Sequence, residues 1–189
     1  MRGQRRGSRL ERDAGATLLE FAIVSVLLFA LLFGIIEFGY QFNNYQAVRQ
    51  GVREASRQGA VVRFGTDSAC GLTSLSGTPS ADVQKLMCLT KNQVGLGDGA
   101  TRVKVLLGDP DIAVQQSTGY VEGNSLVVCA ETRMSSLTGM FAPIVDSKVL
   151  KSKTTIRIEQ DAPTAQRDGQ EAAHPGSSWG WCTLTGAAP

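Results

Sequence analysis

Few side chains in this sequence have the types and spacing that catalysis or metal binding requires. There is one histidine, His174, and four cysteines, of which no two form a Cys-x-x-Cys pair. That set does not match the usual ligand spacings of zinc, and a Cys/His nucleophile pair would need a free thiol. We also expect no serine nucleophile elbow and no His-Glu-x-x-His helix. The sequence therefore predicts no catalytic residue, no metal, no cofactor and no enzymatic activity.

The four cysteines are better suited to cross-linking than to catalysis. In order along the chain they are Cys70, Cys88, Cys129 and Cys182. An even number of cysteines in a small domain that faces an oxidising compartment predicts two disulfides. Three pairings are possible, and we favour Cys70 with Cys88 and Cys129 with Cys182 because these residues are neighbours in sequence. Buried free thiols are the alternative.

One carboxylate stands in an unusual place, near the start of an apolar run. It belongs to Glu20, and the residues that follow it, 21–36, carry no charge and no proline. As a helix with about 1.5 Å rise per residue, this run covers about 24 Å. With its flanks 16–19 and 38–40, it exceeds the roughly 20 residues that cross a hydrocarbon core of ~30 Å. We therefore predict a membrane-spanning helix.

Charge is distributed unevenly along the chain. Residues 1–15 hold five arginines and two acidic residues, whereas the formal net charge of the whole chain is only +2. The positive-inside rule places such a basic head in the cytoplasm and the C-terminal domain outside. The near-neutral remainder gives no electrostatic reason to expect nucleic-acid binding.

The apolar run is expected to stay in the protein as an anchor. A secretory signal peptide has a shorter apolar region, of about 7–15 residues, followed by a small-x-small cleavage site. Here the run leads into residues 37–44, Glu-Phe-Gly-Tyr-Gln-Phe-Asn-Asn, which offer no such site. The helical spacing of apolar residues then continues to about residue 62.

The remainder of the chain predicts a small α+β domain. A short helix is expected over residues 81–94, and strands are expected over 102–107, 112–116, 125–133 and 149–159. Three to four of these strands would form an antiparallel sheet. We divide the chain into a leader (1–15), a long helix (16–62) whose first half is transmembrane, an extracytoplasmic domain (63–160) and a tail (161–189). The tail is rich in Gly and Pro, and Cys182 with the two tryptophans can pin it to the domain.

Glu20 permits two interpretations. In the first it sits at the cytoplasmic edge of a plain anchor, with Glu37 about 25 Å away along a helix, at the opposite interface. That position avoids much of the ~2.5–3.5 kcal/mol cost of a charge at the bilayer centre. In the second, cleavage after Gly15 creates a free amine on Ala16, and Glu20 pairs with the amine of a neighbouring subunit. A buried carboxylate with a partner is far less costly than one without.

At this point the sequence resembles a known family. The basic leader, the segment Gly15-Ala-Thr-Leu-Leu-Glu20-Phe21 and the run into residues 33–39, Phe-Gly-Ile-Ile-Glu-Phe-Gly, are similar to the TadE-like pseudopilins of the tight-adherence (Flp/Tad) pilus system. The resemblance covers residues 1–60. It is weaker at residues 154–159, Thr-Thr-Ile-Arg-Ile-Glu, which are similar to the Arg-x-Glu close of such domains.

The resemblance implies a structural protein that is itself the substrate of a processing enzyme. A membrane prepilin peptidase would cut between Gly15 and Ala16, with Glu20 and Phe21 as determinants of processing and assembly. The implied partners are the membrane, the major Flp-type pilin, other minor pseudopilins and the assembly platform of the bacterial inner membrane. An assembly or priming role in an adhesive pilus follows. The alternatives are an uncleaved signal-anchored binding module or adhesin and, third, an anchored exported enzyme.

Overall fold

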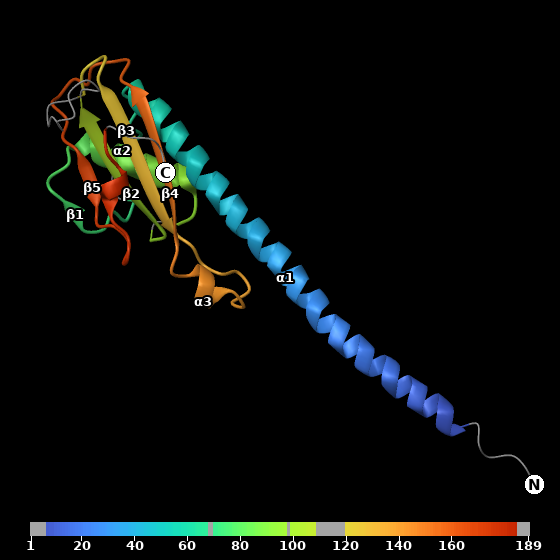
Figure 1. The fold of residues 1–189 in the computed structure, drawn as a ribbon. Coiled ribbons are helices and arrows are strands. Elements are labelled where there is room, and N and C mark those ends of the chain that lie inside the picture. The colour runs from blue at the N-terminus through green and yellow to red at the C-terminus, as the bar shows by residue number, and fades with distance from the viewer. Residues whose placement is uncertain (1–6, 68–69, 98, 109–119, 185–189) are drawn as a thin grey trace, which may run out of the picture. The chain divides into compact units, whose positions relative to one another are not determined.

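The computed structural model describes residues 7–67, 70–97, 99–108 and 120–184, with the backbone alone for 7–14 (Figure 1). The chain divides into two compact units, Met1–Tyr40 and Gln41–Pro189. The strand expected over residues 112–116 lies outside the described residues. The remaining elements can be compared directly with the sequence.

Helix α1, Gly7–Ala60, contains the whole apolar run. Within it, Gly15–Ala60 includes a window of mean hydropathy 2.7, and among the described residues it is the one helix long and apolar enough to cross a membrane. Most large apolar side chains of the first unit are exposed, from 43% at Ile36 to 73% at Ile35. Only an apolar surrounding makes such a surface favourable, as the membrane prediction requires.

The second unit is built around a five-stranded antiparallel sheet, so the predicted α+β fold is confirmed. The strand order is β1-β5-β2-β3-β4. The bounds are β1 Leu75–Ser76, β2 Thr101–Gly108, β3 Ser125–Arg133, β4 Val149–Arg157 and β5 Gly169–Glu171. The helices are α2 Ala81–Val94, the short α3 Ala142–Val145 and a 3-10 turn at Trp179–Trp181. Figure 1 shows α3 and its loop projecting beyond the ends of β3 and β4.

The main core lies between one face of the sheet and the helices. Alternate residues of β2 and β3, such as Val105 and Val128, bury their side chains there with Val52 of α1 and Leu86 of α2. Two glycines of α1 that the sequence marks as weak helix formers are points of close approach. A Cβ on Gly51 would lie 2.6 Å from the backbone N of Val94, and a Cβ on Gly59 would lie 2.8 Å from Leu126 Cδ2.

The opposite face of the sheet is covered by the C-terminal tail. Leu106 and Val127 pack there with Trp179 and Cys182, and all four are buried. The tail also supplies β5, which pairs with β2 and β1. The sheet therefore has five strands, where three to four were expected, because two short strands of two and three residues show no periodicity that a sequence could reveal.

Candidate functional site

The residues predicted for processing lie on one stretch of helix. Gly15, Ala16, Glu20 and Phe21 all belong to α1, and all four are exposed, Phe21 by 70%. No atom outside the local helix backbone comes within 4 Å of a Cβ built on Gly15. A side chain at position 15 would therefore meet open space among the described residues.

Helical spacing relates the predicted scissile bond to the acidic residue. Ala16 and Glu20 are four residues apart, so they lie on the same face of α1, one turn from each other. An amine at Ala16, created by cleavage, would add a positive charge at the start of the helix. The unpaired backbone N–H groups there also favour a nearby carboxylate. Side chains of the same helix surround Glu20 with apolar surface: Leu19 is 63% exposed and Phe21 is 70% exposed. A carboxylate in that setting is stable in a membrane only if a cation or a donor is supplied to it.

The four cysteines form two disulfides in the second unit. Cys70 pairs with Cys88, with a Cα–Cα distance of 5.3 Å, and Cys129 pairs with Cys182, at 6.2 Å. These are the neighbouring pairs that the sequence analysis favoured. The first joins the loop after α1 to α2, and the second fixes the tail to the centre of the sheet.

A buried ion pair and the hydrogen bonds around it join α2, β5, β2 and the loop that precedes β1. Lys91 Nζ lies 2.8 Å from Glu171 Oε1, and neither side chain is exposed. The same carboxylate accepts the backbone N–H of Thr73 and of Val103, each at 2.9 Å, and Arg102 lies 3.7 Å away. Every oxygen of Glu171 is thus occupied by a donor, as burial of a charge requires. This arrangement is structural, because it presents no open side on which a substrate could bind.

A second buried carboxylate, Glu131, fixes the chain just before the 3-10 turn. It accepts hydrogen bonds from the backbone N of His174 and, at 2.7 Å, from Ser177 Oγ. The ring Nε2 of His174 lies 3.0 Å from the carbonyl oxygen of Ala100. His174 is therefore buried, and its hydrogen bonds to Glu131 and Ala100 fix this part of the tail to the sheet.

The expectation that the sequence contains no Gly-x-Ser-x-Gly pattern was wrong. Residues 176–180 read Gly-Ser-Ser-Trp-Gly. Ser178 is exposed and precedes a three-residue 3-10 turn, not the strand-to-helix turn of a hydrolase. The ring of His174 is already engaged by Ala100. The pattern is therefore a coincidence of sequence.

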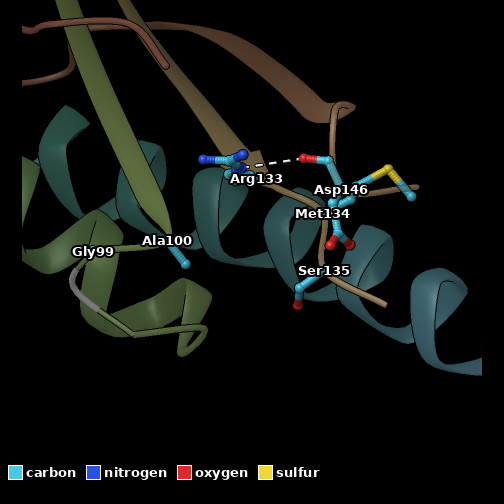
Figure 2. A pocket seen from close by; sticks show the side chains of 6 residues that line it. All are labelled: Gly99, Ala100, Arg133, Met134, Ser135 and Asp146. Carbon is cyan, nitrogen blue, oxygen red and sulfur yellow. Dashed lines mark hydrogen bonds between the residues drawn. The ribbon is translucent and has the colours of Figure 1, made fainter. Parts of the chain in front are cut away.

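The described part of the second unit carries a few open hollows on its surface. One of them, of about 270 Å³, is lined by Gly99, Ala100, Arg133, Met134, Ser135 and Asp146 (Figure 2). In it, Arg133 Nε donates to the carbonyl oxygen of Asp146 at 3.2 Å. The carboxylate in the lining, Asp146, accepts the backbone N–H of Ser136 at 2.8 Å. Within the described residues, no group of three or more His, Cys, Asp or Glu side chains is placed to hold a metal ion.

Sequence reasoning missed the two buried glutamates. Glu131 lies in a strand and Glu171 in a tail expected to have little regular structure, and their partners are 43 and 80 residues away along the chain. One local signal existed: a glutamate in the apolar strand 125–133 is unusual, since charged side chains are almost never fully buried without a partner.

Comparison with known proteins finds similarity in the N-terminal region. Residues 15–57 match the family described as TadE-like protein, so the predicted resemblance is confirmed over this stretch. The match begins at Gly15 and includes Glu20. Similarity to this family suggests a protein associated with the Tad pilus. No curated protein and no solved structure is significantly similar to the chain.

Proposed function

We propose that this protein is a minor pseudopilin that takes part in assembly or priming of a Flp/Tad-type adhesive pilus. One observation carries the proposal: the match to the TadE-like family spans residues 15–57, which hold both the candidate cleavage residue and the acidic residue five positions later. The exposed apolar surface of the same helix supports it, because a helix of this kind is stable in a bilayer or among other such helices.

The proposed sequence of events starts at the cytoplasmic face of the inner membrane. A prepilin peptidase hydrolyses the Gly15–Ala16 bond, which releases the basic leader and leaves a charged α-amino group on Ala16. The positive-inside rule supports this orientation, with the second unit outside. The two disulfides fit an oxidising compartment there.

After cleavage, Glu20 is the fifth residue of the mature chain and the only charged side chain in the first part of the span. We propose that it accepts the α-amino group of a neighbouring subunit, either the major pilin or another minor pseudopilin. In a low-dielectric surrounding such a pair is strong, and a single unpaired carboxylate is costly. The pairing would therefore select the axial register in which two helices pack. No cofactor takes part.

Two substitutions of Glu20 separate charge pairing from simple tolerance of an acid. Glu20→Gln keeps the size of the side chain and removes its charge, and Glu20→Asp keeps the charge. The proposal predicts that pili are largely lost with Glu20→Gln and at least partly kept with Glu20→Asp, at equal levels of membrane-inserted protein. Electron microscopy of sheared surface fibres measures the outcome. Normal piliation with Glu20→Gln would leave Glu20 as an interfacial residue of a plain anchor and favour the uncleaved adhesin.

A further inference from the structure

The connection between β3 and β4 carries an exposed apolar surface that the proposed assembly role does not use. We call residues 134–145, which include α3, the β3–β4 loop. Three of its large side chains are exposed: Leu137 by 58%, Met140 by 54% and Ile144 by 68%. No residue of the loop is charged. Such a cluster on an outer domain is costly in water and marks a contact surface.

The loop is attached next to the end of the membrane-spanning run. Gln41 Nε2 donates to the carbonyl oxygen of Ser135 at 2.7 Å. Gln41 lies five residues after Ile36, the last residue of the apolar run. Five residues of helix rise about 7.5 Å, and even a fully extended chain of five residues spans at most about 18 Å. The covalent chain alone therefore holds the base of the loop near the membrane surface.

The exposed apolar side chains of the second unit concentrate at this end. Beyond the span, the large hydrophobic side chains of the described chain that are at least about a third exposed are Phe42, Val61, Val121, Leu137, Met140 and Ile144. Phe42 is the neighbour of Gln41, and three others belong to the loop. Four of the six therefore gather where the chain leaves the apolar run.

The charges around the loop fit a lipid surface. Arg133 and Lys148 flank it and are exposed. The carboxylate of Asp146, the acidic residue between them, accepts the backbone N–H of Ser136 at 2.8 Å. Apolar side chains bracketed by cations match the acyl boundary and the phosphate layer of a bilayer.

We propose that the β3–β4 loop inserts Leu137, Met140 and Ile144 into the interfacial layer of the membrane on the side of the second unit, with Arg133 and Lys148 at the phosphates. The loop then acts as a second membrane contact besides the helix. It limits how far the outer unit can tilt or rise from the surface before the protein is drawn into a fibre. The proposal requires the apolar run to span the membrane and does not require a pilus.

Site-directed spin labelling of the full chain in vesicles of phosphatidylcholine and phosphatidylglycerol tests this contact. The nitroxide is attached at Met140→Cys, with a parallel label at Ile144→Cys. Val121→Cys is the matched control, because Val121 is also exposed, at 49%, but precedes β3 while the loop follows it. Nine strand residues separate the two sites by about 30 Å.

The expected result is a several-fold higher ratio of oxygen to nickel-chelate accessibility at Met140 and Ile144 than at Val121. Equal ratios at all three sites would overturn the proposal, because the loop would then be in water. Labels that are shielded from both reagents in dilute vesicles would also overturn it, since the loop would then be packed against protein.

A charge placed in the loop provides a second measurement. In the Met140→Cys background, Leu137→Glu together with Ile144→Glu should shift the label toward nickel accessibility, whereas Val121→Glu should leave it unchanged. Circular dichroism and intact disulfides confirm folding of each variant. An unchanged label at Met140 in the folded double variant would contradict insertion. Because the vesicles contain no pilus component, this outcome is independent of the assembly proposal.

Discussion

The two units of the chain differ in where their large apolar side chains lie. In residues 15–40 most large apolar side chains are exposed, and Phe21, Ile23 and Val26 are each at least 66% exposed. In residues 41–184 most of the corresponding side chains are buried, and Val52, Leu86 and Val128 have no measurable exposure. The first unit therefore depends on its surroundings, and the second is stabilised from within.

Similarity to a known family was found in one region of the chain, and that region spans the boundary between the two units. A helix surface that packs in a bilayer or against other helices restricts which residues fit at each position. A core requires only apolar side chains of suitable volume and shape, which many sequences provide. The match covers residues 15–57, so it includes the described apolar helix of the first unit and the part of α1 that enters the core of the second unit.

The largest expected loss of stability comes from removing the buried ion pair of the second unit. Glu171→Ala would leave Lys91 charged and buried without its partner, which costs about 3–5 kcal/mol of the free energy of unfolding. Thermal unfolding followed in the near-ultraviolet, where the two tryptophans report, measures the loss. The helicity of the first unit should be unchanged.

Lys85→Ala is the matched control, since the ion pair of Lys85 with Asp82 at 3.1 Å is partly exposed. Its removal should cost about 0–1 kcal/mol. Equal destabilisation by the two substitutions would contradict the role assigned to the buried pair.

The disulfides give the next largest effect and sharpen the contrast within the second unit. The bridge from Cys129 to Cys182 closes a separation of 53 residues, and that from Cys70 to Cys88 closes 18. On loop-closure entropy, replacing each pair by serine should cost about 4 and about 3 kcal/mol respectively. Denaturant unfolding of the two double variants gives this order. A larger loss from the shorter loop would show that native packing, not chain entropy, sets the contribution.

The smallest expected effect tests one hydrogen bond at the end of α1. Tyr120 donates its hydroxyl proton to the carbonyl oxygen of Gly59, and its ring packs edge-on against Phe64 at 5.1 Å. Burial, with a contribution from Asp82, raises the pKa of Tyr120 above its usual value of about 10. The stabilisation is therefore complete below about pH 10 and is lost as the pH rises further, because only the unfolded chain ionises.

Tyr120→Phe should cost about 1 kcal/mol near neutral pH and remove this alkaline loss. Between about pH 8 and about pH 11, the wild type should lose on the order of 1 kcal/mol more stability than the variant. Urea titrations at both pH values measure the difference. Parallel losses in the two proteins would mean that the phenol ionises equally in the folded and unfolded states.

The sequence predicted local features well and tertiary ones poorly. The long helix, the spacing of Gly15 and Glu20, and strands such as 125–133 follow from residue types within a few positions of each other. The pairing of Lys91 with Glu171, by contrast, depends on contacts between segments 80 residues apart. Gly51 and Gly59 show the same limit: sequence marks them as helix-weakening, and packing shows why only glycine fits.

Cleavage after Gly15 stays a prediction, because it depends on a peptidase that is a separate protein. The central claim is that the first unit begins at Ala16 in the working protein. Intact mass and N-terminal sequencing of the protein, coexpressed with a prepilin peptidase, test it most directly. Gly39→Trp serves as the control for Gly15→Trp, since a Cβ on either glycine meets no atom within 4 Å.

The account predicts that the wild type and Gly39→Trp lose residues 1–15 and begin at Ala16, whereas Gly15→Trp keeps the full-length mass. A wild-type protein that keeps its full-length mass in the presence of an active peptidase would contradict the account.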